Sequence, residues 1–274
     1  MSFKKIFNGW LAIVPVLVCY LFFFIAPVVF VFYEPLQAPV ATFNRMLSDS
    51  YLLSSITGSI VLSVMASFAS LVVALFISFH LSRCSDTTRQ FFSILISLPL
   101  VFSGLIVAYG FILVFGRAGF VTQLLGQVGF SDQYIGNIIF TPIGLGMAYC
   151  YYLIPRAVFI LLPVFQSFDW RQIDVSKSFG ATTLQSYRFI LFPQVLPAMI
   201  TSLCVMCSVA LGAYGTALAL SGTQLNILPL VLYSKISDGG TDFPVVGMLS
   251  IVLIALCLTF TFISDYLTRK YDYK

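Results

Sequence analysis

Six apolar runs, each long enough to cross a bilayer as a helix, constrain this chain more than any other feature of its sequence. A membrane-spanning helix needs about 20 apolar residues, because it rises about 1.5 Å per residue through about 30 Å of hydrocarbon. Only the fourth run contains a charged residue, Arg156. We therefore predict an all-α polytopic membrane protein with about six transmembrane helices. The runs are residues 10–32, 56–79, 91–115, 138–165, 195–220 and 243–263.

The composition excludes a water-soluble fold. Of the 274 residues, 59% are hydrophobic and 9% are charged, and the mean hydropathy is +1.01. So few polar side chains cannot cover a soluble globule of this size. The net charge of +4 comes from basic residues spread over several loop ends, so we predict no nucleic-acid partner. No repeat or long linker divides the chain, which predicts one membrane domain in a lipid bilayer.

The distribution of Lys and Arg predicts the orientation, because short loops that carry basic residues stay in the cytoplasm. With both termini inside, the outer loops hold only Arg45, Arg117 and Lys235. The long polar segment 169–194 is then cytoplasmic. The basic residues on the cytoplasmic side are Lys4, Lys5, Arg83, Arg89, Arg171, Lys177, Arg188, Arg269, Lys270 and Lys274.

The first apolar run follows Lys4 and Lys5, as the core of a signal peptide would. It is longer than the 7–15 residues, roughly, of such a core, and no small-x-small cleavage site follows it directly. An uncleaved membrane anchor is therefore the favoured interpretation.

Residue types that carry catalysis or bind metals are scarce. His80 is the single histidine and has no partner nearby in the sequence. Cys204 and Cys207 form a Cys-x-x-Cys, but they lie in an apolar run without a neighbouring acid, so they are interpreted as small packing side chains. We predict no catalytic residue, no metal site and no cofactor.

The polar segment 169–194 carries the signals of a short first helix. Asp174 can begin a helix that continues through Phe179, because a carboxylate is favourable at a helix N-terminus. Gly180 can then adopt the left-handed conformation that ends many helices.

A second helix is predicted to follow directly. Thr182 and Gln185 have the spacing of a capping box, and Pro193 must end or kink the helix that they begin. The segment is therefore predicted to form helix, turn, helix. Its mixed surface can either lie against the bilayer or dock in a groove of another protein. That surface consists of Val175, Phe179, Leu184, Tyr187 and Phe189 beside Lys177 and Arg188.

The same segment resembles the EAA loop of bacterial ABC importer permeases. The family pattern is Glu-Ala-Ala, three residues, Gly, nine residues, Ile, one residue and Leu-Pro, and Gly180, Ile190 and Pro193 fall in register with it. Asp174 stands where the family has Glu, and Phe192 stands where it has Leu. Val175 and Ser176 replace the two alanines. Residues 212–220 also resemble the fifth-helix region of the branch that includes polyamine, sulfate or molybdate, iron, thiamine and phosphonate permeases.

The resemblance implies a non-catalytic subunit that works with several partners. It implies two ABC ATPase subunits, a second permease chain that is identical or homologous, and an extracytoplasmic solute-binding protein. It also implies that this chain is located in the bacterial inner membrane. This chain lacks a Gly-x-x-x-x-Gly-Lys-Ser/Thr phosphate loop, so ATP hydrolysis must occur in another polypeptide. The ATPase-coupling residues implied by the resemblance are Asp174, Val175, Ser176, Lys177, Phe179, Gly180, Ile190 and Pro193.

The same reasoning predicts three regions. Residues 1–55 form a cytoplasmic tip, the first transmembrane helix and an outer loop. Residues 56–266 form the permease core, with the coupling loop at 169–194 between helices 4 and 5, and residues 267–274 form a cytoplasmic tail. The connection 221–242 is rich in turn formers and is predicted to be a solvated loop.

Arg156 is the candidate for contact with the solute. A charged side chain at the centre of a membrane helix costs roughly 2.5–3.5 kcal/mol on insertion scales, so it requires a reason. It can bind backbone carbonyls freed by Pro155 or a neighbouring helix, or it can line the pathway and favour an anion.

The predicted function is therefore the solute pathway of an ATP-driven importer, with a small polar or anionic solute such as a phosphonate. Polyamine, iron or thiamine transport by the same family is the alternative. An ion-coupled secondary transporter is an alternative of another class, but it would be expected to bury acidic residues at mid-membrane, and the apolar runs contain none. A membrane-embedded enzyme would need a cluster of reactive side chains.

Overall fold

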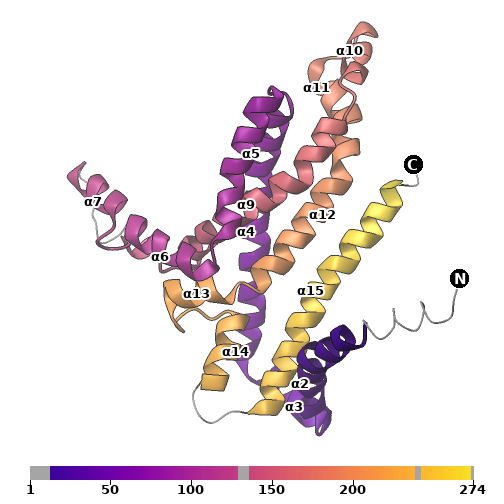
Figure 1. The fold of residues 1–274 in the computed structure, drawn as a ribbon. Coiled ribbons are helices and arrows are strands. Elements are labelled where there is room, and N and C mark those ends of the chain that lie inside the picture. The colour runs from indigo at the N-terminus through magenta and orange to yellow at the C-terminus, as the bar shows by residue number, and fades with distance from the viewer. Residues whose placement is uncertain (1–12, 129–135, 238–241, 273–274) are drawn as a thin grey trace, which may run out of the picture.

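The computed structural model describes residues 13–128, 136–237 and 242–272, and helices are the only regular elements in these ranges. This confirms the all-α prediction. The predicted cytoplasmic tip with Lys4 and Lys5, and the final residue Lys274, lie outside the described residues. In chain order the elements of Figure 1 are η1 (Leu21–Ile25), α2 (Ala26–Leu36), α3 (Pro39–Ser48), α4 (Ser50–Ser82), α5 (Asp86–Val101), α6 (Gly104–Phe115), α7 (Phe120–Gln127), α9 (Pro142–Ser167), α10 (Arg171–Ser178), α11 (Thr183–Ser186), η2 (Tyr187–Leu191), α12 (Phe192–Leu211), α13 (Tyr214–Ser221), α14 (Leu228–Ser237) and α15 (Phe243–Asp272).

Six helical stretches of the described chain are long and apolar enough to cross a membrane, which confirms the predicted number. Their ends differ from the sequence-based runs, most clearly in the third and fifth, where the helix is broken within the run. The stretches are Ile13–Leu36, Ser50–Ser82, Gly104–Gln127, Pro142–Ser167, Thr183–Leu211 and Phe243–Arg269.

The core forms where α4, α9 and α12 pack side by side (Figure 1). Small side chains let these helices approach closely, and Ala74, Ala148 and Ala157 are fully buried between them. Several buried hydroxyls on α4 are satisfied within their own helix, as in the bond that Ser70 donates to the Ala66 carbonyl (2.7 Å). The buried hydroxyls of Ser67 and Ser78 have no hydrogen-bond partner among the described residues.

The third and fifth apolar runs are each broken into two helices, which corrects the prediction of continuous spans. The third run is interrupted at Phe102 and Ser103, where the backbone is extended between α5 and α6. In Figure 1, α6 and α7 turn away from the direction of α5. The fifth run is interrupted at Gly212 and Ala213, between α12 and α13. Apolar periodicity continues across both breaks, so hydropathy alone could not locate them.

The two breaks meet inside the protein, which explains how they are tolerated. The N-terminus of α6 packs on that of α13, and a Cβ on Gly104 would lie only 2.3 Å from the Thr216 hydroxyl oxygen. The Tyr149 hydroxyl donates a hydrogen bond to the Ala213 carbonyl at the second break (3.0 Å). Irregular backbone at membrane depth is stable only where protein groups satisfy it, and these contacts do so.

The prediction that the connection 221–242 is a solvated loop is wrong for its described residues. It contains α14, whose first residues Leu228, Pro229, Leu230 and Val231 are buried. The Leu228 amide donates a hydrogen bond to the Ser59 hydroxyl on α4 (2.7 Å). The described part of this connection therefore contains a helix that packs against α4 and α15.

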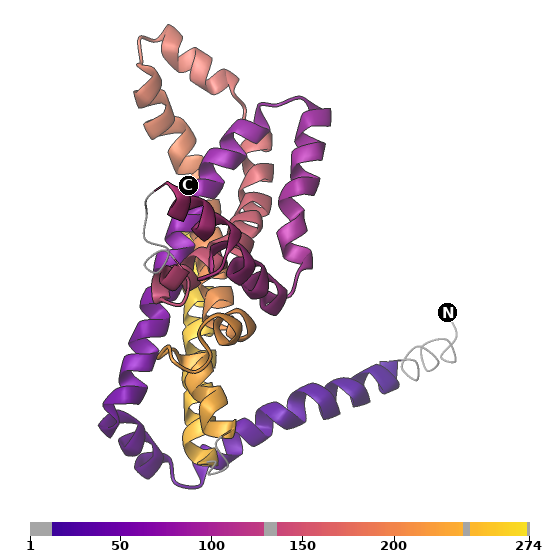
Figure 2. The same ribbon diagram turned by 90° about the vertical axis from the view of Figure 1, so that its left-hand side faces the viewer.

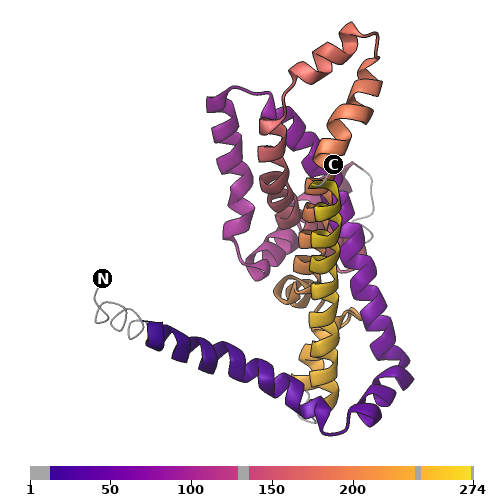
Figure 3. The same cartoon turned by 90° about the vertical axis from the view of Figure 1, so that its right-hand side faces the viewer.

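The first membrane-length helix stands away from the bundle (Figures 2 and 3). Its most apolar stretch within Ile13–Leu36 has no buried residue. Only its end contacts the bundle, where Pro35 lies 2.7 Å from the position of a Cβ on Gly247 of α15. We call Ile13–Leu36 the N-terminal arm.

The contact between α6 and α13 predicts a glycine requirement at position 104. Gly104→Leu should lower the free energy of unfolding by about 1–3 kcal/mol, because the added side chain has to separate the two helices. Thermal unfolding of the purified chain in detergent measures this. Gly110→Leu is the matched control, because no atom lies within 4 Å of a Cβ there. Equal losses in both variants would contradict the close approach.

Candidate functional site

The polar segment 169–194 projects beyond one end of the bundle as two short helices, which confirms the predicted helix, turn, helix (Figure 1). The first helix, α10, begins at Arg171 rather than at Asp174. The Asp169 carboxylate accepts a hydrogen bond from the Arg171 amide (3.1 Å), so it caps the chain earlier than predicted. Asp174 instead lies in the first turn of α10, where its charge is still favourable.

The turn between the helices depends on Gly180, whose φ is +88°. The Gly180 amide bonds to the Lys177 carbonyl (2.9 Å), and the Ala181 amide bonds to the Ser176 carbonyl (3.1 Å). No atom lies within 4 Å of a Cβ at Gly180, so backbone conformation alone restricts this position. The following capping box is present as predicted, with hydrogen bonds in both directions between Thr182 and Gln185.

A hydroxyl–hydroxyl contact joins α10 and α11 into one unit. The hydroxyls of Ser176 and Ser186 are 2.6 Å apart, and Ser186 is buried. Ile173 is also buried, on the same inner side of α10. Ser176 therefore faces its own chain, although the sequence pattern grouped it with the outward coupling residues.

The outer side of α10 presents apolar side chains to the surroundings. Phe179 is 87% exposed and Val175 is 54% exposed. Asp174 and Lys177 are exposed beside them, and neither makes a salt bridge within the described residues. Leu184, on α11, is 77% exposed. We call α10, Phe179, Gly180 and α11 the coupling tip.

Ile190 and Pro193 lie at the base of the coupling tip. Ile190 packs against the main core. Pro193 does not end the helix. The chain forms the π-helical turn η2 over Tyr187–Leu191 and continues into α12, with Pro193 in the first turn of α12. Pro lacks an amide hydrogen, and the first turn of a helix is where this loss costs least.

A cluster that sequence reasoning missed fixes the coupling tip to α4. The Arg83 guanidinium lies 4.2 Å from the Trp170 ring centroid and 4.6 Å from that of Phe79, and it donates a hydrogen bond to the Tyr187 hydroxyl (3.2 Å). Phe79 also packs edge-on against Trp170 and Tyr187. We call Arg83, Phe79, Trp170 and Tyr187 the Arg83 clasp. Phe79 and Arg83 lie at the end of α4, whereas Trp170 directly precedes α10 and Tyr187 directly follows α11. Spacing along the chain therefore could not reveal the cluster.

Arg156 lies half-buried on α9, away from the coupling tip. Its guanidinium makes no hydrogen bond or salt bridge to the described part of the chain. Tyr152, one turn earlier, is close enough to interact with its charge, and Thr216 of α13 is close to the Tyr152 hydroxyl. Gly104 of α6 packs on Thr216. Arg156 therefore follows Tyr152 by one turn of α9, and Tyr149, two turns before Arg156, contacts the second break.

Residues 66–273 match the family described as binding-protein-dependent transport system inner membrane component. The chain belongs to this family. It is a permease subunit of a binding-protein-dependent ABC importer, and subunits of this kind are non-catalytic membrane proteins.

Curated relatives of this permease transport different solutes. The sulfate transport system permease protein CysT of Salmonella typhimurium is 22% identical over 203 residues, which are 73% of this chain and 70% of the relative. The spermidine/putrescine transport system permease protein PotC of Haemophilus influenzae is 27% identical over 45% of this chain and 48% of the relative. The putative ferric transport system permease protein FbpB 1 of the same organism is 26% identical over 96% of this chain, but over only 42% of its own length.

A solved structure has the same fold as this permease. It is the crystal structure of a bacterial alginate ABC transporter in complex with an alginate pentasaccharide-bound periplasmic protein. One of its chains superposes with a TM-score of 0.77 at 16% sequence identity, over 97% of this chain and 96% of that chain. At this identity the likeness establishes the fold.

The Arg83 clasp predicts how firmly the permease holds its coupling tip. Arg83→Ala should lower the local free energy of opening of residues 169–194 by roughly 1.5–3.5 kcal/mol, the sum of two cation–π contacts and a hydrogen bond. Hydrogen exchange of the purified chain measures this. Arg89→Ala is the matched control, because Arg89 lies near the start of α5, shortly after Arg83 in the chain, and pairs only with Asp86 among the described residues. Unchanged exchange in Arg83→Ala would show that the clasp does not hold the tip.

Proposed function

We propose that this chain forms the solute pathway of an ATP-driven importer and couples it to a separate ATPase through the segment 169–194. The observation that carries the proposal is the outward exposure of apolar side chains on the coupling tip, with Phe179 87% exposed. An exposed apolar helix beyond the membrane-length helices requires a partner, because water disfavours such a surface. A groove in an ATPase fits a helix that presents such anchors.

The eight residues of the family pattern divide into two groups under this proposal. Asp174, Val175, Lys177 and Phe179 contact the ATPase directly. Their exposure supports this role. Because the Asp side chain is shorter than the Glu of the family pattern, we expect Asp174 to contribute less than Phe179.

The other members hold the tip in place. Gly180 permits the turn through its positive φ, and Ser176 joins α10 to α11. Ile190 and Pro193 connect the tip to α12. These residues set where the contact surface stands relative to the bundle.

Coupling follows from the rigid connection between the tip and the bundle. ATP binding closes the two ATPase subunits, and a helix seated in their groove moves with them. The tip continues directly into α12 and is clasped to the end of α4, so the movement reaches two of the three central helices. The bundle can then exchange inward-facing and outward-facing states, with each state favoured by a different nucleotide condition.

The remaining partners follow from exposed surfaces and from the proposed orientation. With both termini in the cytoplasm, the coupling tip meets the ATPase and the opposite end meets an extracytoplasmic solute-binding protein. The N-terminal arm supports a second permease chain, because its unburied length of Ile13–Leu36 is available to another subunit. The second chain is either a copy of this one or a homologue.

We propose an anionic solute, such as a phosphonate. Arg156 supports this, because it is a charged residue in a membrane helix without a hydrogen-bonded or ionic partner among the described residues. Two turns earlier on α9, Tyr149 contacts the break where α13 begins, and helix N-termini also favour anions. Sulfate permeases among the relatives agree with an anion, whereas the polyamine and ferric relatives represent the alternative of a cation.

Gly180 provides the test of coupling. Gly180→Val should abolish ATPase association and uptake, because a β-branched residue resists the left-handed backbone at a cost of roughly 1–2 kcal/mol. Gly180→Asn is the matched control and should retain both activities, since Asn tolerates this conformation. Co-purification of the ATPase and uptake into vesicles are the measurements. Uptake by Gly180→Val without any ATPase would overturn the importer proposal.

Arg156 provides the test of the solute class. Arg156→Leu should insert and bind the ATPase normally but lose uptake of a phosphorylated or sulfonated solute by at least about tenfold, the factor for roughly 1.4 kcal/mol. Arg156→Lys keeps the positive charge and should retain most of the uptake. Normal uptake of such a solute by Arg156→Leu would remove the anion proposal while leaving the ATPase coupling intact.

A further inference from the structure

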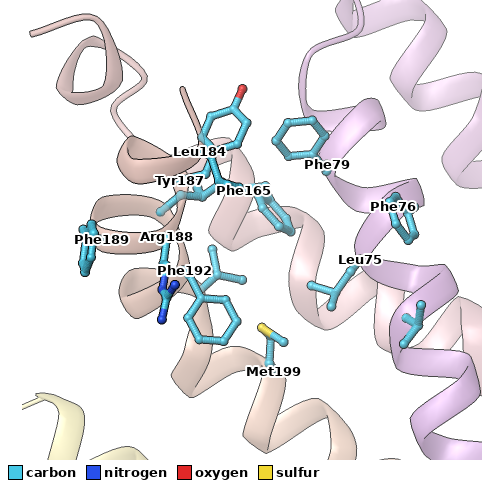
Figure 4. A pocket seen from close by; sticks show the side chains of 13 residues that line it. Leu75, Phe76, Phe79, Phe165, Leu184, Tyr187, Arg188, Phe189, Phe192 and Met199 are labelled. Atoms are coloured by element: carbon cyan, nitrogen blue, oxygen red, sulfur yellow. The ribbon is translucent and has the colours of Figure 1, made fainter. Parts of the chain in front are cut away.

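A hollow of about 780 Å³ opens beside the base of the coupling tip (Figure 4). One wall is the last part of α4, with Val72, Phe76 and Phe79, and the other is η2 and the first half of α12. The membrane-length stretch Ser50–Ser82 ends at this level, and the stretch Thr183–Leu211 begins there. The hollow therefore lies toward one end of these two membrane-length stretches, and a headgroup layer borders the hydrocarbon core at either end of such a stretch.

The lining of the hollow is apolar except for one cation. Of its thirteen described lining residues, Arg188 is the single charged one. Phe76, Phe192 and Leu184 are at least half exposed, so the lining is not covered by the chain itself. Burying such a surface against hydrocarbon is favourable by about 25 cal/mol per Å².

The Arg188 side chain lies beside the ring of Phe192 (Figure 4). Its guanidinium makes no hydrogen bond or salt bridge to the described residues. Its one recorded contact is with the ring of Phe189, at 5.8 Å from the centroid. A guanidinium beside an apolar groove at the membrane surface favours an anionic partner. A phosphate is suited to this role, because it can accept two hydrogen bonds in the bidentate geometry that a guanidinium prefers.

We infer that the hollow binds a membrane phospholipid with an anionic headgroup, whose phosphate pairs with Arg188 and whose acyl chain lies between α4 and α12. An anionic lipid satisfies both parts of the lining at once. A helix from a second copy is a poorer match, because among the six membrane-length stretches only Ile13–Leu36 and Phe243–Arg269 carry a carboxylate, Glu34 and Asp265, each near the end of its stretch. The bilayer supplies this ligand at the level where the hollow opens.

The bound lipid gives the coupling tip a third support. Phe79 and Tyr187 belong to the Arg83 clasp and also line the hollow. The lipid thus packs on the reverse side of the contact that joins the tip to α4. The outer side of the tip is left free for a protein partner. Contact with the bilayer and docking to a protein, the two uses predicted for this segment, then belong to different sides of it.

Native mass spectrometry of the full chain tests the inference with two lipids of identical acyl chains, phosphatidylglycerol and phosphatidylcholine. The unaltered chain should prefer phosphatidylglycerol. Arg188→Gln should reduce that preference about fivefold, the factor for roughly 1 kcal/mol per basic residue at a membrane surface. Arg171→Gln is the matched control, because Arg171 is exposed on α10 and does not line the hollow. It should retain the full preference.

Met199→Trp probes the apolar part of the site. Met199 lines the hollow beyond Phe192, so a larger side chain there should weaken binding of both lipids while leaving the preference between them unchanged. An unchanged lipid preference in Arg188→Gln would overturn the inference. So would a disulfide cross-link from Phe192→Cys to a second permease chain, because it would place protein in the hollow. Neither outcome depends on the ATPase, so the proposed coupling is tested separately.

Discussion

The structure depends on one constraint, which is that every backbone amide and carbonyl within the hydrocarbon must find its partner inside the protein. Continuous helices meet this requirement by themselves, and α4 does so over Ser50–Ser82. The interrupted runs meet it by bringing their breaks together. The start of α6 packs against the start of α13, and the Tyr149 hydroxyl binds the Ala213 carbonyl. The only charged side chain of the apolar runs, Arg156, lies two turns along α9 from Tyr149.

Outside the hydrocarbon the constraint changes, and the coupling tip shows the consequence. Its short helices are too short to be stable in isolation, so they need caps and tertiary contacts. The capping box at Thr182 and the left-handed Gly180 define the local shape. The Arg83 clasp and the continuation into α12 then fix that shape to the bundle. A stiff connection of this kind can pass a displacement of the tip to the central helices, which is what coupling to an ATPase demands.

Exposed apolar surfaces show where the chain is incomplete alone. The N-terminal arm has no buried residue in its most apolar stretch, the coupling tip presents Phe179, and the hollow beside Arg188 is open. Each surface differs in chemistry. The arm is apolar except for Glu34 near its end, which suits another helix or lipid, whereas the tip mixes aromatic and charged side chains, which suits a protein groove. The hollow combines hydrocarbon surface with one guanidinium, which suits an anionic amphiphile.

The sequence by itself determined the class of the protein, the number of membrane-length helices and the shape of the coupling tip. These depend on local properties, namely apolar run length, capping residues and a glycine with positive φ, and local properties are legible along a chain. The breaks at Ser103 and Ala213, the burial of α14 and the Arg83 clasp were decided only by tertiary structure. Each arises from contacts between residues far apart in the sequence, such as Gly104 with Thr216 and Arg83 with Trp170. Hydropathy reports how apolar a segment is, but the partner that satisfies a backbone group or holds a cation is chosen by packing.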